Sequence, residues 1–454
     1  MKEFDLIVIG GGSGLDVAVS ASEKRLKTAI IEKGPLGGTC LNRGCIPSKM
    51  LIHSADVISQ IKKAHLFGIN AKINSIDFKK IISRVTNTVD SEAKEIEHSL
   101  KNSKNPVLFK SYCKFIDFKT IQVGKEILKA DKFLLAVGAR TIIPEIKGLN
   151  KVNYITSTEA LRLKKLPKVM TIIGGGYIAA ELAHFYGELG TKINIIQHNK
   201  LLVPREDSEI SEKFTEIFRK KYNVFTEYEA SEITKKGNNF FVKIKHNTKN
   251  ITKTLKSDQL LIAIGVMPNS DLLNLEKTKV KTDEKGFIKV NEFLETNVPG
   301  VYALGDCIGK YLFKHSANLE ADYAYNNLIS ESKLKVDYSA MPHAIFTSPQ
   351  IASVGYTEQE LKDKKINYAV GKYNYIDTGM GHAIEEKDGF VKILVEKSTR
   401  KILGCHILGQ EASTLIHEVI IAMKSGDRTI DNISNSVHIH PALSEVIQRA
   451  AANF

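Results

Sequence analysis

The chain has 454 residues, of which 43% are apolar and 25% charged, a globular composition that excludes a disordered or fibrous protein. Its net charge is +13, and no stretch approaches the roughly 20 apolar residues that a membrane helix needs. Residues 2–5 carry charges of both signs and are not typical of a signal peptide. Because five cysteines in so long a chain do not form a disulfide scaffold, we expect a cytoplasmic protein.

Residues 6–32 predict a strand, a glycine-rich turn, a helix and a second strand. The glycines of the turn are Gly10, Gly12 and Gly14. In a dinucleotide-binding unit such glycines permit a tight turn and a close approach to a pyrophosphate, and a carboxylate about 20 residues later binds a ribose hydroxyl. Glu32 has that position. Leu15 departs from the small residue that the motif favours, and Gly14 would relieve the crowding.

Cys40 and Cys45 follow this unit closely. Five residues of regular helix rise about 7.5 Å, whereas the Cα atoms of a disulfide lie roughly 4.4–6.8 Å apart. A bridge therefore needs a distorted turn, which Gly44 permits, and a short strained loop makes a bridge that is easily reduced. Spacing alone leaves two alternatives open: buried inert thiols, or half of a zinc site completed by His438 and His440. The position after a nucleotide-binding unit favours a redox pair.

A second copy of the strand–turn–helix pattern occupies residues 170–197, with Gly174 and Gly176 in the turn. A further pair of apolar runs, each stopped by glycine and then proline, ends at Gly138 and at Gly265. The repeat predicts two nucleotide-binding domains. Gln197 stands where Glu32 stands in the first copy, and His198 follows it. A neutral amide tolerates either ribose and nearby cations favour a 2′-phosphate, so NAD and NADP both remain open.

The last part of the chain predicts a hairpin, a helix and a base. Residues 390–395 and 401–408 flank a polar turn, and residues 412–423 keep helical apolar spacing. His440 and Glu445 follow, and a carboxylate that orients an imidazole makes it a base able to activate thiols. We expect His438 to be structural, and Cys113, Cys307 and Cys405 to be packing residues.

Taken together, these motifs resemble the flavin-dependent pyridine nucleotide–disulfide oxidoreductases, the family of dihydrolipoamide dehydrogenase, glutathione reductase and mycothione reductase. Residues 37–49 resemble its redox signature, residues 296–306 its second FAD signature, and residues 440–445 its catalytic dyad, in which the His–Pro bond is commonly cis. The resemblance spans the whole chain. It implies an α/β protein with two Rossmann-like dinucleotide-binding domains and a C-terminal α+β interface, or dimerisation, domain.

The resemblance also implies a domain order. Residues 1–147 would bind FAD, residues 148–268 NAD(P), residues 269–340 would return to the FAD side, and residues 341–454 would form the interface domain.

The resemblance further assigns site residues. Cys45 would face the flavin and Cys40 exchange with the substrate, while Lys49 would pair with Glu181. His440, held by Glu445, would come from the other subunit of an obligate homodimer. The residues implied for FAD are Gly10, Gly12, Gly14, Glu32, Lys33, Gly38, Thr39, Lys49, Cys113, Gly138, Asp306, Leu312 and His315. Those implied for NAD(P) are Gly174, Gly176, Tyr177, Ile178, Glu181, Gln197, His198 and Gly265, with Tyr177 beside the nicotinamide pocket. No metal is expected.

Two substrate classes remain. The form of the redox motif favours dihydrolipoamide dehydrogenase, which would oxidise dihydrolipoyl groups on a carrier protein with NAD. Gln197 and the mycothione reductase-like tail favour an NADPH-dependent reductase of a small disulfide. Lysines scattered without interleaved aromatics do not favour nucleic-acid binding, and we expect no membrane partner. The charge of +13 would steer acidic lipoyl domains or anionic thiols towards the site.

Overall fold

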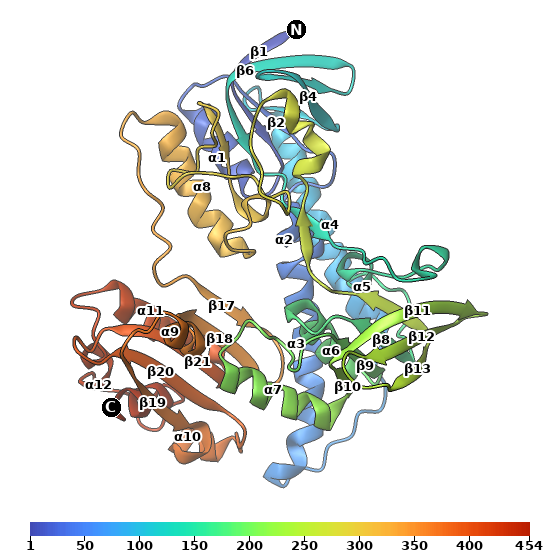
Figure 1. The fold of residues 1–454 in the computed structure, drawn as a ribbon, viewed down its shortest axis with the longest axis vertical. Helices are drawn as coiled ribbons and strands as arrows, with labels where there is room; N and C mark the ends of the chain where they lie inside the picture. Colours follow the sequence, from blue (N-terminus) through green and yellow to red (C-terminus); the bar gives the residue numbers. More distant parts are fainter. The chain divides into compact units, whose positions relative to one another are not determined.

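The computed structural model describes all residues from 1 to 454, and they form two compact units. The first contains Met1–Met50, Lys80–Ile142 and Gly265–Asp337, and the second contains Leu51–Lys79, Ile143–Ile264 and Tyr338–Phe454. Helices and parallel strands alternate in both units, which confirms the predicted α/β class (Figure 1). The four segments predicted from the sequence divide the chain more finely, and their boundaries stay predictions.

The first unit is built on a seven-stranded sheet. Its path runs β3–β2–β1–β6–β5–β4, and β16 pairs with β6 off this path. The strands β1, β2, β3, β6 and β16 are parallel, and β4, β5 and the start of β6 form an antiparallel meander. The strand bounds are Lys2–Ile9 (β1), Thr28–Ile31 (β2), Val107–Phe109 (β3), Cys113–Asp117 (β4), Thr120–Val123 (β5), Glu126–Leu135 (β6) and Val301–Ala303 (β16). A separate pair joins β7 (Ala139–Thr141) to β15 (Val266–Pro268).

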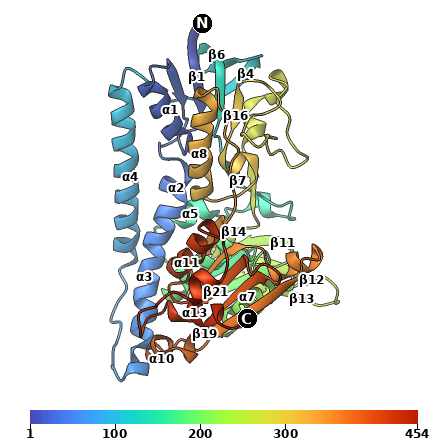
Figure 2. The same cartoon turned by 90° about the vertical axis from the view of Figure 1, so that its left-hand side faces the viewer.

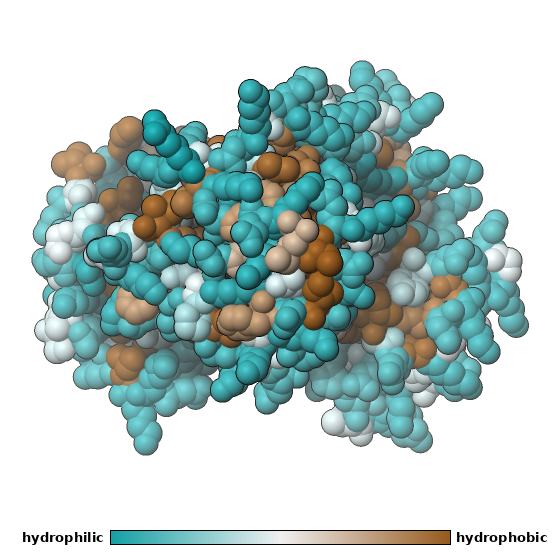
Figure 3. All heavy atoms as spheres, turned by 90° about the horizontal axis from the view of Figure 1, so that it is seen from above, coloured by the Kyte–Doolittle hydropathy of each residue, from teal (hydrophilic) through white to brown (hydrophobic).

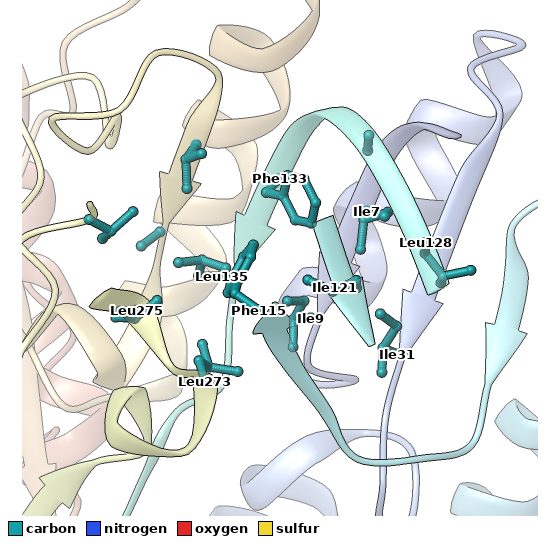
Figure 4. Packing of buried hydrophobic residues seen from close by; sticks show 14 of the residues in the cluster. Ile7, Ile9, Ile31, Phe115, Ile121, Leu128, Phe133, Leu135, Leu273 and Leu275 are labelled. Carbon is teal, nitrogen blue, oxygen red and sulfur yellow. The ribbon is translucent and has the colours of Figure 1, made fainter. Parts of the chain in front are cut away.

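Both faces of this sheet are buried, as its continuous apolar strands require. Ile7 and Ile9 of β1 point into one core with Phe133 and Leu135 of β6 (Figure 4). Leu6 and Val8 of β1 pack into a second cluster, with residues of α1 (Gly14–Glu23) and α8 (Lys314–Ile329). These two helices lie side by side (Figure 2). The short α2 (Gly38–Arg43) and the 3₁₀ turn η5 (Gly305–Ile308) also belong to this unit.

The second unit contains the repeat of the nucleotide-binding pattern. A parallel sheet of order β10–β9–β8–β14 is flanked by α6 and α7, and β11, β12 and β13 form an antiparallel sheet. The bounds are α5 Ser157–Ala160, β8 Val169–Ile173, α6 Tyr177–Glu188, β9 Lys192–Gln197, α7 Ser208–Lys221, β10 Asn223–Thr226, β11 Tyr228–Lys236, β12 Asn239–His246, β13 Thr252–Ser257 and β14 Gln259–Ile262.

A five-stranded antiparallel sheet, β17–β18–β21–β20–β19, completes the second unit. The predicted hairpin is confirmed, since β20 and β21 pair antiparallel, and so is the predicted helix, which is α11. The bounds are β17 Pro342–Ile345, β18 Gln350–Gly355, α9 Glu358–Asp363, β19 Tyr368–Asn374, α10 Gly379–Ala383, β20 Phe390–Glu396, β21 Ile402–Gly409, α11 Ala412–Lys424, α12 Asp431–Ser434 and α13 Glu445–Ala451.

Two long helices, α3 (Cys45–Lys63) and α4 (Phe78–Asn102), contribute residues to both units. Within the second unit, α3 is tied to α6 by polar pairs: Asp56 lies 2.8 Å from the buried His184, and Lys62 lies 3.0 Å from Glu188. None of the helices combines the length and apolar content that a membrane crossing needs. Hydrophilic residues cover most of the face in Figure 3, with hydrophobic residues in scattered groups.

Candidate active site

The two cysteines of the predicted redox pair lie on either side of a break between helices. Cys40 belongs to α2, which ends at Arg43, and Cys45 begins α3. Gly44 between them has φ −142° and ψ −119°, and a Cβ there would lie 2.8 Å from the carbonyl oxygen of Thr39 and 3.2 Å from Cα of Cys40. The distorted turn that a bridge requires is therefore present, and glycine is the residue that it accommodates. Both side chains are half-buried free thiols in this structure.

The two sulfurs have unequal acidity. A hydrogen bond from the Cys45 thiol, supported by the positive charge of Lys314, lowers the pKa of Cys40 to about 7 despite its burial. The same hydrogen bond, together with burial, raises the pKa of Cys45. Above about pH 7, Cys45 thus retains its proton while Cys40 is mainly thiolate, which is the nucleophilic form of a cysteine.

The redox segment is docked on the first glycine-rich loop. The Gly37 amide donates to the Gly11 carbonyl at 2.8 Å, and a Cβ on Gly38 would lie 2.7 Å from Cα of Gly12. Asn42, between the two cysteines, donates to the carbonyls of Leu36 and Gly38 at 2.7 and 2.9 Å. This packing places the thiols beside the loop that opens α1.

The loop itself has the predicted geometry. Gly10 has φ +115°, and a Cβ there would overlap the Ala136 carbonyl. A Cβ on Gly14 would lie 2.9 Å from side-chain carbons of Val8 and Ala136, so the close helix–strand contact occurs at Gly14 and Leu15 is accommodated beside it. Glu32 accepts from the Gly11 amide at 2.8 Å and from the Gly34 amide at 2.7 Å, so the loop holds the carboxylate expected to bind a ribose.

The other residues implied for FAD are dispersed around the first unit. The Lys33 ammonium lies 4.8 Å from the centre of the Tyr112 ring, and burial raises the pKa of Cys113, at the start of β4, to about 12. Gly138 has φ +64°. Leu312 is half-buried before α8, and the exposed His315 stacks on Phe313 with ring centres 5.4 Å apart. Thr39 is exposed in α2, and Lys49 is half-buried in α3.

Asp306 is a half-buried carboxylate that no donor of the chain satisfies. It lies in η5, directly after β16, at the carboxyl end of the sheet. Burial alone raises its pKa to about 6. A carboxylate left in this state needs an external donor such as a hydroxyl group.

The second loop repeats the geometry of the first. Gly174 has φ +118°, and a Cβ there would overlap the Ala263 carbonyl, just as Gly10 meets Ala136. Gly265 has φ +127°. The buried Gln197 donates to the Leu201 carbonyl at 3.1 Å, so it occupies the place of Glu32 with an amide in place of a carboxylate.

Beyond Gln197, the candidate cation His198 is already paired. It is exposed, and its Nδ1 lies 2.6 Å from Glu229.

Helix α6 carries three of the residues expected to bind NAD(P). Tyr177 is its first residue and donates to Glu206, Ile178 is 38% exposed, and Glu181 is buried and accepts from the Phe346 amide at 3.1 Å. Because Lys49 belongs to the first unit and Glu181 to the second, their pairing stays a prediction.

His440 and Glu445 form the expected dyad. His440 Nδ1 lies 3.0 Å from Oε1 of the buried Glu445, whose second oxygen accepts from the Ala442 amide at 3.1 Å. The His440 bond lowers the pKa of Glu445. The bond between His440 and Pro441 is cis. The His440 side chain is 76% exposed, so Nε2 faces outward and is accessible to a proton donor.

His438 differs from His440, because it is nearly buried and its Nε2 lies 2.5 Å from Glu418. This is the structural role expected for it. The structure contains no group of three or more histidine, cysteine and acidic side chains placed to hold a metal ion.

The comparisons with known proteins cover the whole chain. The model of the pyridine nucleotide-disulphide oxidoreductases matches residues 4–325, and that of their dimerisation domain matches residues 341–451. The chain belongs to this family of disulphide oxidoreductases.

Relatives of this oxidoreductase include enzymes with different substrates. It is 33% identical to mycothione reductase of Mycobacterium tuberculosis over 99% of each chain. It is 36% identical to mitochondrial dihydrolipoyl dehydrogenase 1 of Arabidopsis thaliana, covering 99% of this chain and 90% of the relative. Among solved structures, the HOCl-induced flavoprotein disulfide reductase RclA of Escherichia coli superimposes with a TM-score of 0.88 at 26% identity, covering 99% of each chain.

The family uses FAD and NAD(P)H, and the residues of this oxidoreductase fit both. The unsatisfied Asp306 carboxylate lies at the carboxyl end of the first sheet, where a bound FAD would offer hydroxyl donors. A Cβ on Gly12 would have a single neighbour, 3.7 Å away, and a Cβ on Gly176 would meet nothing within 4 Å. Both glycines therefore leave open space beside the starts of α1 and α6, where a pyrophosphate would bind.

Sequence reasoning missed three residues of this site. Lys314 donates to Ser13 at the start of α1 at 2.7 Å and also lowers the pKa of Cys40. It lies between Leu312 and His315, which the resemblance assigns to FAD, but nothing in the sequence there marks it as close to a thiol. Glu206 and His343 surround Tyr177 and come from segments with no motif of their own.

Proposed function

We propose that this oxidoreductase is a dihydrolipoyl dehydrogenase, which takes two electrons from a dihydrolipoyl dithiol and delivers them to NAD. The observation that carries the proposal is the pairing of a lowered-pKa Cys40 with a Cys45 that retains its proton, in a segment of the dihydrolipoamide dehydrogenase form. Support also comes from plant and chlamydial dihydrolipoyl dehydrogenases that are 34–36% identical over nearly the full chain.

In the proposed reaction, His440 Nε2 removes the proton of one substrate thiol, and the Glu445 carboxylate stabilises the imidazolium. The substrate thiolate attacks Cys40 of the oxidised pair, which forms a mixed disulfide and releases Cys45 as a thiolate. The second substrate thiol then displaces Cys40 and leaves its proton on the reduced pair. The substrate is thereby oxidised, the pair is reduced by two electrons, and His440 holds the first proton. FAD, when bound, supplies the two-electron relay between the pair and the nicotinamide.

We propose that the enzyme works as a homodimer in which His440 serves the cysteines of the partner subunit. The dimerisation domain that matches residues 341–451 supports this arrangement. The residues beside His440 support it too, because Val437 is fully exposed and Ile439 is 78% exposed. Apolar side chains next to a catalytic base are stabilised when a second subunit covers them.

A second candidate is an NADPH-dependent reductase of a small disulfide, run in the opposite direction with the same residues. Gln197 favours it for two reasons. The amide accepts hydrogen bonds from a ribose diol less well than a carboxylate does, and, being neutral, it does not repel a 2′-phosphate. The similarity to mycothione reductase points the same way. The pairing of His198 with Glu229 weakens it, because that acidic partner would repel a phosphate.

The two candidates are separated by a matrix of NAD, NADH and NADPH against dihydrolipoamide, lipoamide, glutathione disulfide and a general aromatic disulfide. The first proposal predicts turnover of the lipoyl pair with NAD and NADH. Activity with NADPH alone and none with either lipoyl compound would contradict it. A second test uses a lipoyl-bearing carrier domain: the net charge of +13 predicts a rate that falls as salt rises. A rate that is insensitive to salt would remove the carrier's electrostatic attraction from the proposal.

A further inference from the structure

The backbone of Tyr177 belongs to the second glycine-rich loop, and its side chain belongs to a buried polar cluster. Tyr177 follows Gly176 at the carboxyl end of β8 and is half-buried. Its phenol donates to Glu206, and its ring stacks on His343 with ring centres 5.8 Å apart and an interplanar angle of 16°. The ring is therefore held from its hydroxyl end and from one face.

Glu206 is the centre of this cluster. Its side chain has no exposed surface, yet it accepts from Ser353 at 2.8 Å, and its two oxygens lie 2.9 and 3.0 Å from Nε2 of His343. Burial acts to raise the pKa of Glu206, but the bonds from His343, Tyr177 and Ser353 outweigh it and hold that pKa below the ordinary range. Hydrogen bonds to an ionised acceptor are roughly twice as strong as neutral ones.

The backbone that carries Glu206 is fixed as well. The Gln359 side chain donates to the backbone carbonyl of Glu206 at 2.8 Å. The backbone amide of Glu206 donates to the Val203 carbonyl at 3.0 Å. The next residue, the fully buried Asp207, lies 2.9 Å from the ammonium of the equally buried Lys392. Glu206 therefore cannot follow a movement of Tyr177, and the cluster acts as a rigid anchor.

We propose that Glu206 and His343 are positioning residues that hold the Tyr177 ring in place as a wall of the nicotinamide site. The proposal rests on the proposed function, in which a nicotinamide nucleotide exchanges electrons with the enzyme, and on the expectation that Tyr177 lies beside the nicotinamide. Nucleotides bind at the carboxyl ends of parallel strands, which is where this ring lies. A ring fixed before the nucleotide arrives loses no rotamer freedom on binding, so the anchor strengthens nucleotide binding and orients the nicotinamide.

Two variants of the holoenzyme test this proposal. Tyr177→Phe keeps the ring and removes the bond to Glu206. Glu206→Gln leaves one acceptor oxygen for three donors. Stopped-flow absorbance at the flavin band then follows two separate reactions: reduction by the nicotinamide nucleotide that the wild type uses, and reduction by dithiothreitol through the cysteine pair.

The expected result is a split between the two reactions. Both variants should raise the Kd of the nucleotide and slow flavin reduction by it, each by about tenfold, the effect of losing a hydrogen bond to a charged group. Reduction by dithiothreitol should stay within about twofold of the wild type. The matched control is Tyr186→Phe, which removes a tyrosine hydroxyl from the same helix. That hydroxyl lies outside the cluster and donates to the Ala160 carbonyl. This variant should leave the nucleotide reaction unchanged.

Equal loss in both reactions, or a nucleotide reaction in Tyr177→Phe like that of the wild type, would overturn the proposal. If Glu206→Gln does not fold, Tyr177→Phe decides alone, because it removes a single oxygen. Dithiothreitol replaces the physiological dithiol, so the result does not depend on whether lipoamide is the substrate. An enzyme without lipoyl activity that shows the split would refute the proposed substrate and keep the anchor.

Discussion

Removing the sulfur of Cys45 should raise the pKa of Cys40. In the structure the Cys45 thiol is the largest cause that lowers the pKa of Cys40 from 9.0 to about 7, with Lys314 as a further cause. That difference of two pKa units corresponds to about 2.7 kcal/mol of preferential stabilisation of the thiolate. Cys45→Ala removes the hydrogen-bond donor and leaves a small apolar side chain in its place.

The change in reactivity follows from the thiolate fraction. With a pKa of about 7, about half of Cys40 is thiolate at pH 7, whereas at the ordinary 9.0 about 1% is. Because Lys314 remains, we expect Cys40 of Cys45→Ala to be alkylated at pH 7 between about fivefold and about fiftyfold more slowly than in the reduced wild type.

The assay is iodoacetamide labelling of the reduced enzyme from pH 5.5 to 9.5, with the modified peptides quantified by mass spectrometry. Cys113, whose pKa burial raises to about 12, is the internal control and should stay unlabelled at pH 7. A wild-type midpoint near 9, or the same midpoint in Cys45→Ala, would refute the hydrogen bond as the cause.

Three further predictions follow from buried or paired charges. Glu445→Gln should lower the steady-state turnover number for dithiol oxidation at least about tenfold, because His440 loses the carboxylate that orients it, and an unchanged number would contradict the dyad. Lys392→Met should lower the free energy of unfolding in urea by about 3–5 kcal/mol, because it leaves the buried Asp207 unpaired; a loss below about 1 kcal/mol would show that the pair is not needed. In the flavin-free protein, Asp306 has a folded-state pKa of about 6, above its ordinary 3.8, so its contribution to stability is full below about pH 4 and is lost as pH rises through 6. Asp306→Asn should remove that pH dependence from the urea unfolding curve, and the same slope in both proteins would refute it.

The nucleotide-binding fold could be predicted because its signals are local. Gly10 and Gly174 are required by positive φ angles and by carbonyls that leave no room for a Cβ, so the sequence must show glycine there. Those carbonyls belong to Ala136 and Ala263, which directly follow β6 and β14, and the apolar runs of these two strands are equally visible in the sequence. Gly44 likewise marks the turn between the cysteines.

The rest of the site depends on contacts between distant segments. Glu206 lies 137 residues from His343 and 147 from Ser353, and no spacing rule predicts that three donors converge on one carboxylate. Lys314 affects Cys40 only because α8 packs beside α1. The substrate is also not encoded locally, because relatives of similar identity over nearly the whole chain are named for different substrates.

The central claim, that Cys40 and Cys45 are a working redox pair coupled to a flavin, is tested most directly by counting electrons. The oxidised holoenzyme is titrated anaerobically with dithionite while the flavin absorbance is followed. A disulfide and a flavin each accept two electrons, and each dithionite molecule supplies two. The wild type should therefore consume about two dithionite molecules per flavin before the flavin is fully reduced, and Cys40→Ser about one. A wild type that consumes about one dithionite molecule per flavin, like the variant, would contradict the claim.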